Sequence, residues 1–155
     1  MARRNIREYP LRPVVGVGGV VIADGKALLI RRGHAPLKGQ WSIPGGTLET
    51  GETIVEGIER ELAEETGIKV RALQLIEVFE RIFRDEEGRV QYHFVILDYL
   101  CEMMGGRVHA GGDVVDVAWA NEEELLNYGL TEAATRVLKK AFRMSRKGIT
   151  AGQEM

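Results

Sequence analysis

The chain has 155 residues, the usual size of one domain, and 45% of them are hydrophobic while 28% are charged. This composition excludes a disordered chain and predicts a single globular domain over residues 1–155. The formal net charge of −2 gives no overall attraction to polymeric nucleic acid or to an anionic membrane, so we expect neither partner.

The predicted elements begin with a hairpin. Residues 14–22 are rich in Val and Gly, residues 26–32 resume an apolar run, and the turn dipeptide Asp24-Gly25 lies between them. A loop rich in Gly and Pro then extends to residue 46.

Helical periodicity follows over residues 53–66. Thr53 and Glu56 have the spacing of a capping box, which satisfies unpaired backbone donors at the start of a helix. Gly67 is the stop signal.

The rest of the chain mixes strands and helices without a strict βαβ repeat. Further strands are predicted at 69–83, 91–103 and 114–119 and further helices at 122–126 and 131–144. The sequence therefore predicts one α/β sandwich with a mixed sheet.

The two ends differ from this domain. Residues 1–12 are locally basic, and residues 145–155 form a tail that we expect to be flexible. No apolar run approaches the roughly 20 residues that cross a bilayer, and no signal-like segment follows the basic start. We expect a cytoplasmic protein, and we assign no chemistry to its single cysteine, Cys101, which lies in a strand-like apolar run.

The helix at 53–66 carries an unusual set of acids. Its core-facing stripe consists of Ile54, Ile58 and Leu62. At about 100° per residue, Glu61 and Glu65 fall inside the same sector and Glu64 borders it. Carboxylates at these spacings repel one another, more strongly when partly desolvated, and the negative end of the helix dipole adds to the repulsion.

Something cationic must therefore compensate the three glutamates. Arg60 is the one basic neighbour on the helix, and one Arg cannot neutralise three carboxylates. Clustered oxygen ligands suit Mg²⁺, for which Mn²⁺ can substitute. A divalent-metal site, with the hydrolytic or phosphoryl chemistry that such ions support, is the prediction from the residues alone.

At these residues the chain resembles the Nudix hydrolase family, whose box has the form Gly-x5-Glu-x7-Arg-Glu-aliphatic-x-Glu-Glu-x-Gly-aliphatic. The matching positions are Gly46, Glu52, Arg60, Glu61, Leu62, Glu64, Glu65, Gly67 and Ile68. The resemblance implies an α/β/α sandwich with a loop-helix-loop that holds magnesium over the pyrophosphate link of a nucleotide.

The resemblance also implies residue roles. Glu61, Glu64, Glu65 and the Gly46 carbonyl become metal ligands. In the supporting ion pair, Arg60 would hold Glu52 and orient the ligands.

The resemblance leaves two roles open, the general base and the residues that bind the substrate. Glu61 is the first choice for the general base, and relatives that use a distant loop acid make Asp113, or Asp116 beside it, the alternative. For substrate binding the candidates are Arg32, then Arg31, with Gly45 and Asp113.

Residues that could hold a nucleobase are less distinctive. They are Trp41, Tyr92, His93 and Phe94. Core packing is the favoured explanation for each of them. His34 and His109 are expected in exposed loops.

The resemblance implies a small-molecule nucleotide substrate, with ADP-ribose favoured and (d)NTP hydrolysis as the alternative. A third hypothesis is a nucleotide-binding regulator that does not cleave its ligand, although such proteins typically lose box acids that are intact here. A homodimer, to which the basic segment before Val14 would contribute, also remains open.

Overall fold

A computed structural model describes residues 7–148 of the chain. The strands are β1 (Val14–Ala23), β2 (Lys26–Arg32), β3 (Trp41–Ser42), β4 (Gly45–Thr47), β5 (Ile68–Arg84), β6 (Val90–Gly106) and β7 (Val114–Ala120). The helices are α1 (Ile54–Thr66), the short 3-10 helix η1 (Glu123–Tyr128) and α2 (Glu132–Arg146). Residues 1–6 of the predicted basic segment and 149–155 of the predicted tail lie outside the described residues.

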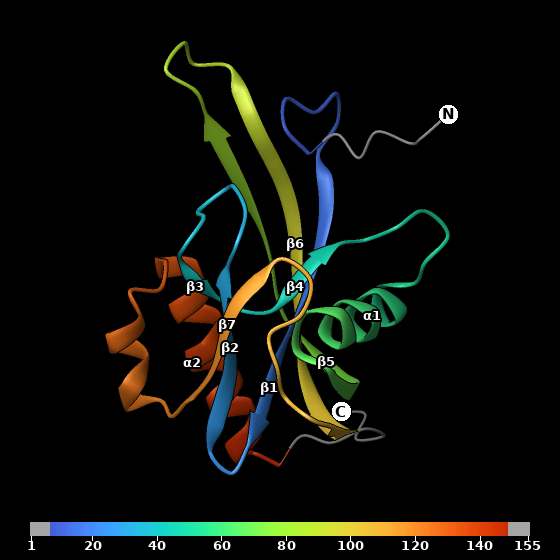
Figure 1. Ribbon diagram of the computed structural model, residues 1–155, viewed down its shortest axis with the longest axis vertical. Helices are drawn as coiled ribbons and strands as arrows, with labels where there is room; N and C mark the ends of the chain where they lie inside the picture. Colours follow the sequence, from blue (N-terminus) through green and yellow to red (C-terminus); the bar gives the residue numbers. More distant parts are fainter. Residues whose placement is uncertain (1–6, 149–155) are drawn as a thin grey trace.

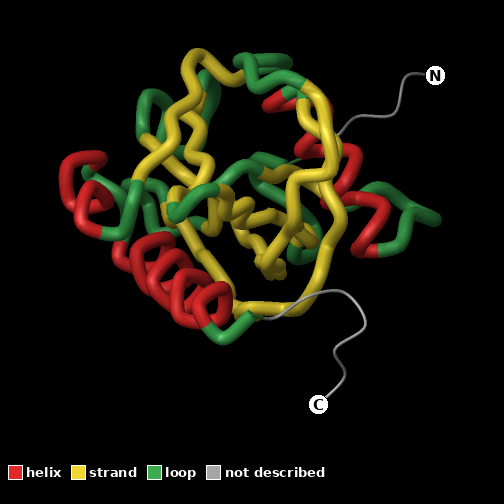
Figure 2. The backbone as a smooth tube through the Cα atoms, turned by 90° about the horizontal axis from the view of Figure 1, so that it is seen from below, coloured by secondary structure: helices red, strands yellow, loops and turns green. Residues whose placement is uncertain are grey.

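The mixed sheet lies between α1 and α2, which cover opposite sides of it (Figures 1 and 2). One apolar cluster joins the sheet to α2 through Val137, Leu138 and Phe142. Another joins it to α1 through Ile58 and Leu62. The predicted α/β/α sandwich is confirmed.

The strand order is β3-β2-β1-β6-β5, with β4 paired to β1 and β7 paired to β2. β1 and β6 run parallel over eight residue pairs, from Val14 opposite Phe94 to Val21 opposite Cys101. β5 and β6 form a long antiparallel hairpin that projects beyond the rest of the molecule (Figure 1).

The first predicted hairpin is confirmed, but its two strands pair only next to the turn. β1 and β2 pair at only two positions, Ile22 with Ala27 and Ala23 with Lys26. The two strands then diverge because β1 pairs with β6, whereas β2 pairs with β7. Partners distant in sequence therefore decide the pairing.

Local signals account for the bounds of α1. The Thr53 hydroxyl accepts a hydrogen bond from the Glu56 amide, as the capping box predicts. Gly67 ends the helix with φ of 75°, in the left-handed region that favours glycine, and its N–H donates to the Ala63 carbonyl. Gly19 lies under the helix where a Cβ atom would crowd Ile58 and Leu62, so its missing side chain lets α1 approach β1 closely.

The sequence missed two short strands, β3 and β4, in the loop before α1. A Cβ atom at Gly45 would overlap the Val17 carbonyl, so β4 can lie against β1 only because that position is glycine. This contact fixes the loop at the amino-terminal side of the helix. Among the described residues, no helix has the length and hydropathy needed to cross a membrane.

Candidate functional site

Two adjoining pockets lie beside α1 and β4. The larger one has a volume of about 560 Å³ and is lined by five acids, Glu49, Glu61, Glu64, Glu65 and Asp113. The smaller one has a volume of about 140 Å³ and is lined mainly by apolar side chains. Both pockets are lined by Arg7, His34, Gly45, Gly46 and Thr47.

The Arg60 guanidinium is held by Glu52 through a two-pronged contact. Arg60 Nε donates to Glu52 Oε2 at 2.6 Å and Nη2 donates to Oε1 at 2.9 Å. Nη2 also donates to the Thr47 carbonyl at 3.1 Å, which ties the fork to β4. These hydrogen bonds lower the pKa of Glu52 to about 2 and raise that of Arg60.

Arg60 also contacts the glutamates that follow it. Its Nη1 donates to Glu61 Oε1 at 2.7 Å and lies 3.4 Å from Glu64 Oε2. The Glu61 carboxylate rests directly over Gly46, where a Cβ atom would overlap it. Burial raises the pKa of Glu61 despite the contact with Arg60.

Glu65 is the most deeply buried of the three glutamates. Its Oε1 accepts a hydrogen bond from the Gly45 amide at 2.8 Å, which links the end of α1 to β4. Burial, opposed by that hydrogen bond and reinforced by the charge of Glu61, raises its pKa to about 7. Glu64 is exposed at the pocket wall, with 56% of its side-chain surface accessible.

The chemistry of these side chains, but not their present spacing, fits a hard divalent cation. Three carboxylates of one helix, with Gly46 beside them, line one cavity, and Arg60 is already engaged by Glu52. Oxygen donors with excess negative charge match the preference of Mg²⁺ or Mn²⁺. Over residues 7–148 no three acidic, His or Cys side chains are drawn together at metal-ligand spacing. Arg60 and the Gly45 amide hold Glu61 and Glu65 as the surroundings of such a site.

The loop after β6 closes the carboxyl-terminal end of α1. The His109 amide donates to the Thr66 carbonyl, and the Gly111 amide donates to the Glu65 carbonyl, both at 2.9 Å. These bonds satisfy carbonyls that a helix end leaves unpaired. They also bring Asp113 to the larger pocket, where its side chain is 80% exposed.

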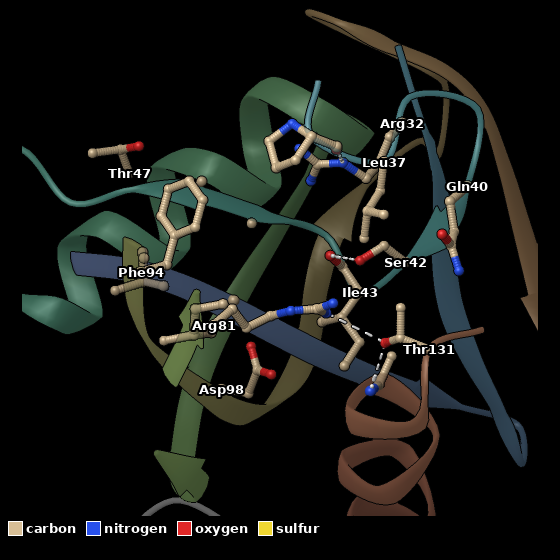
Figure 3. A pocket seen from close by; sticks show the side chains of 18 of the residues that line it. Arg32, Leu37, Gln40, Ser42, Ile43, Thr47, Arg81, Phe94, Asp98 and Thr131 are labelled. Carbon is tan, nitrogen blue, oxygen red and sulfur yellow. Dashed lines mark hydrogen bonds between the residues drawn. The ribbon is translucent and has the colours of Figure 1, made fainter. Parts of the chain in front are cut away.

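The smaller pocket has apolar walls and a polar floor (Figure 3). Its apolar lining includes Leu37, Trp41, Ile43, Phe79, Phe83, Phe94 and Ile96. Asp98 of β6 lies at the floor with 3% of its surface exposed, opposite Gly18 of β1, where a Cβ atom would overlap its carboxylate. Burial raises the pKa of Asp98 to about 7.

Arg81 of β5 faces the same pocket as Asp98 (Figure 3). Its Nη1 donates to the Thr131 hydroxyl at 3.4 Å, a long hydrogen bond, and burial lowers its pKa. Within residues 7–148, neither Arg81 nor Asp98 takes part in an ion pair, although both are partly or fully buried. The pocket thus offers a hydrogen-bond donor, Arg81, and an acceptor, Asp98, to the polar edge of a ligand.

The predicted substrate-binding arginines face different ways. Arg32 lines the smaller pocket, whereas Arg31 is exposed, lines neither pocket and donates to the Gly39 carbonyl at 3.0 Å. The prediction for His34 is wrong, because it is partly buried between the pockets rather than exposed. His109 is exposed, as expected. Asp116 lines neither pocket.

Two of the four residues considered for holding a nucleobase line the pocket, and two do not. Trp41 and Phe94 line the smaller pocket, whereas Tyr92 and His93 do not. Tyr92 packs instead against Phe94, with ring centroids 6.1 Å apart and planes 16° from parallel. Strand alternation explains why Phe94 reaches the pocket while its neighbour His93 points elsewhere.

Sequence reasoning missed Arg7, Arg81 and Asp98. The sequence indicates Arg7 only as part of a basic segment and Asp98 only as part of a predicted strand. A single acid in an apolar run was the one available signal for Asp98, because such a residue is rarely buried without a partner.

Comparisons with known proteins agree with this geometry. The family described as NUDIX domain matches residues 12–141. An ADP-ribose pyrophosphatase of Methanocaldococcus jannaschii is 36% identical over 113 residues, which cover 72% of this chain and 64% of that relative. The nucleoside triphosphatase NudI of Escherichia coli is 33% identical over 128 residues, covering 75% of this chain and 87% of that protein.

Solved structures show the same likeness. A MutT NUDIX hydrolase from Burkholderia pseudomallei aligns with a TM-score of 0.73 and 30% identity, covering 83% of this chain and 98% of that one. An ADP-ribose pyrophosphatase from Streptococcus suis aligns with a TM-score of 0.64 at 20% identity, which supports the fold. With Gly46, Arg60 and the three glutamates of its box around one cavity, the chain belongs to the NUDIX domain family, the family of the Nudix hydrolases.

Proposed function

We propose that the protein is a divalent-metal-dependent hydrolase that cleaves the pyrophosphate link of a nucleoside diphosphate derivative, with ADP-ribose as the first choice. One observation carries the proposal: the cavity that gathers Glu61, Glu64 and Glu65 opens beside a second pocket able to hold a base. A substrate that spans both pockets would place its diphosphate at their junction.

The smaller pocket supports a nucleobase. Its volume of about 140 Å³ is below the range of pockets that hold whole drug-sized ligands and close to that of a cavity that binds benzene. An exocyclic amino group can donate to Asp98 while the adjacent ring nitrogen accepts from Arg81. Adenine and cytosine both present this pair, so the floor is compatible with the adenine of ADP-ribose.

In this arrangement the protein groups have distinct duties. When Mg²⁺ or Mn²⁺ is bound, it polarises a phosphoryl oxygen and lowers the pKa of water. The fork between Glu52 and Arg60 keeps Glu61 over Gly46. Glu61 is our first choice for the base that accepts the proton of the attacking water, and Asp113 on the same cavity is the alternative.

Hydrolysis of nucleoside triphosphates is the second candidate. It is favoured by the extent of the match to NudI, 87% of that protein against 64% of the ADP-ribose pyrophosphatase. A panel of ADP-ribose, dinucleoside polyphosphates, nucleotide sugars and (d)NTPs with Mg²⁺ or Mn²⁺ separates the two. Release of AMP and ribose 5-phosphate supports the first, and release of pyrophosphate from a (d)NTP supports the second. Binding without turnover of any member would favour a regulator.

Glu65→Gln tests the metal-dependent mechanism. We expect the variant to remain folded, because Gln can still accept from the Gly45 amide, and to lose most divalent-dependent hydrolysis, because one ligand charge is gone. Rates at saturating metal measure the effect. Glu59→Gln on the same helix, which lines neither pocket, is the matched control. Equal turnover in both variants would contradict the assignment.

A further inference from the structure

The segment of residues 7–9, called the strap here, is fastened to the β5–β6 hairpin. The Tyr9 amide donates to the Gln91 carbonyl and the Tyr9 hydroxyl donates to Asp85 Oδ2, both at 2.7 Å. Gln91 Nε2 donates to Glu8 Oε2 at 2.7 Å. Figure 1 shows the start of the described chain and the projecting hairpin at the same end of the molecule. The strap therefore folds onto its own chain.

Tyr9 holds a backbone conformation that its own preferences oppose. Its φ is 50°, in the left-handed region, which costs a non-glycine residue roughly 1 kcal/mol or more. Its ring also lies under the Arg89 guanidinium, 5.2 Å from the ring centroid. Together with the two hydrogen bonds, this contact fixes the direction in which the chain leaves Tyr9.

That direction carries Arg7 to the junction of the two pockets. Arg7 lines both cavities, as does His34, and Arg32 lines the smaller one beside them. Arg32 Nε donates to the Pro36 carbonyl at 2.7 Å, and its Nη2 lies 3.5 Å from His34 Nε2. In the described part of the chain, neither Arg7 nor Arg32 forms an ion pair.

Cations gathered in this way need an anion. Burial lowers the pKa of Arg32, and the charge of Arg7 lowers it further. The charge of Glu65 raises the pKa of Arg32, but by less than either burial or Arg7 lowers it, and Arg60 already engages Glu61. A phosphate group matches two convergent guanidinium groups, since each can donate two parallel hydrogen bonds to its oxygens.

We propose that Arg7 is a substrate-phosphate ligand that, with Arg32, binds the diphosphate at the junction of the two pockets. The hydrogen bond from Tyr9 to Asp85 makes Tyr9 a positioning residue for Arg7. The inference rests on the proposed function and adds a phosphate ligand supplied from outside the box. The carboxylates approach the diphosphate through a cation, whereas the arginines contact it directly.

Arg7→Ala tests the ligand, with Arg12→Ala as the matched control because Arg12 is exposed shortly after the strap and lines neither pocket. Loss of a charge-assisted hydrogen bond corresponds to about a 10- to 100-fold rise in KM, with kcat changed much less. Arg7→Lys should recover part of the loss. Affinity for inorganic pyrophosphate in EDTA, measured by calorimetry, should fall similarly in Arg7→Ala and stay unchanged in Arg12→Ala.

Tyr9→Phe tests the positioning role, because it removes only the hydroxyl that Asp85 accepts. We expect a several-fold rise in KM for Tyr9→Phe in the wild-type background. In the Arg7→Ala background the same change should have almost no effect, since there is no longer a guanidinium to position. A merely structural hydroxyl would act equally in both backgrounds and would overturn the positioning role.

The outcomes separate this inference from the proposed function. If Arg7→Ala retains its KM and its pyrophosphate affinity while the protein hydrolyses substrate, the ligand role of Arg7 is wrong and the function stands. If the wild type hydrolyses nothing in the panel, and Arg7→Ala binds pyrophosphate more weakly than the wild type, the proposed function is wrong and the anion site stands. Melting temperatures of all variants identify any loss of folding.

Discussion

At the scale of single residues, glycines determine where the acids of the site can lie. Gly46 leaves room for the Glu61 carboxylate, and Gly18 leaves room for that of Asp98. Both carboxylates lie against backbone that has no side chain, so their positions depend on the missing Cβ atoms. The first glycine belongs to the family box, whereas the second lies in β1, outside it.

Gly46→Ala should therefore displace Glu61 without unfolding the protein. The added Cβ atom would overlap the carboxylate, which can swing away but then leaves Arg60 and the cavity. We expect a loss of metal-dependent turnover of at least about tenfold, as for other changes that misplace metal ligands. Metal titration of the rate measures it.

Gly105→Ala is the control for this change. A Cβ atom there meets nothing within 4 Å, and its φ does not lie in the left-handed region. Full activity of Gly105→Ala beside impaired activity of Gly46→Ala is the expected result. Equal activity of the two variants would show that Glu61 does not need its place over Gly46.

At the scale of elements, the parallel pairing of β1 with β6 creates the floor of the smaller pocket. It sets Gly18 opposite Asp98 and buries that acid among apolar side chains. β5 adds Arg81 and Thr131 caps the start of α2, so four elements meet at one polar spot. As a consequence, the ionisable side chain of Asp98 is buried, with 3% of its surface exposed.

This burial predicts a pH dependence of stability. Because burial raises the pKa of Asp98 to about 7, against 3.8 for an unperturbed group, the folded state keeps a proton that the unfolded chain releases first. The free energy of unfolding should therefore fall as pH rises from about 4 to 7. Asp98→Asn cannot ionise and should show a smaller fall.

Denaturant unfolding at several pH values between 4 and 8 measures the difference. Asp116→Asn is the control, since Asp116 is exposed and lines neither pocket. Nearby charges on β5 are Glu77, whose charge also raises the pKa of Asp98, and Arg81. Parallel profiles for wild type and Asp98→Asn would contradict a buried acid that titrates near neutral pH.

At the scale of the whole molecule, stability and activity oppose each other at the acidic cavity. Glu61 and Glu65 are desolvated near each other and near Glu64, so the folded protein carries like-charge repulsion that a cation would relieve. Such functional repulsion is a common reason why substitutions at active sites raise stability.

Mg²⁺ should therefore raise the melting temperature of the wild type beyond the effect of Na⁺ at equal ionic strength. A ligand at 100 times its Kd raises the free energy of unfolding by about 2.7 kcal/mol. Each kcal/mol raises the melting temperature of a domain of this size by roughly 2–4 °C. Glu65→Gln should show a smaller shift with Mg²⁺ and, in EDTA, a melting temperature at least equal to that of the wild type. Differential scanning calorimetry measures both, and equal Mg²⁺ shifts in the two proteins would contradict the prediction.

The sequence by itself determined the box and all the helices and strands except the two short strands β3 and β4. Thr53, Glu56 and Gly67 set the bounds of α1 through bonds between near neighbours, and apolar runs separated by turn residues marked most strands. The spacing of Glu61, Glu64 and Glu65 indicated their shared side of the helix, because 3.6 residues per turn is a local property. These features require no knowledge of distant contacts.

Only the tertiary structure decided what lies around the box. The parallel partner of β1, the pocket floor at Asp98 and Arg81, and the approach of Arg7 all join residues far apart in sequence. A strand pattern shows which side chains share a face but does not name the strand beside it. For that reason the residues of the proposed metal site were predictable mainly from one helix, whereas the residues proposed to hold the base and the phosphate became visible only when the sheet brought them together.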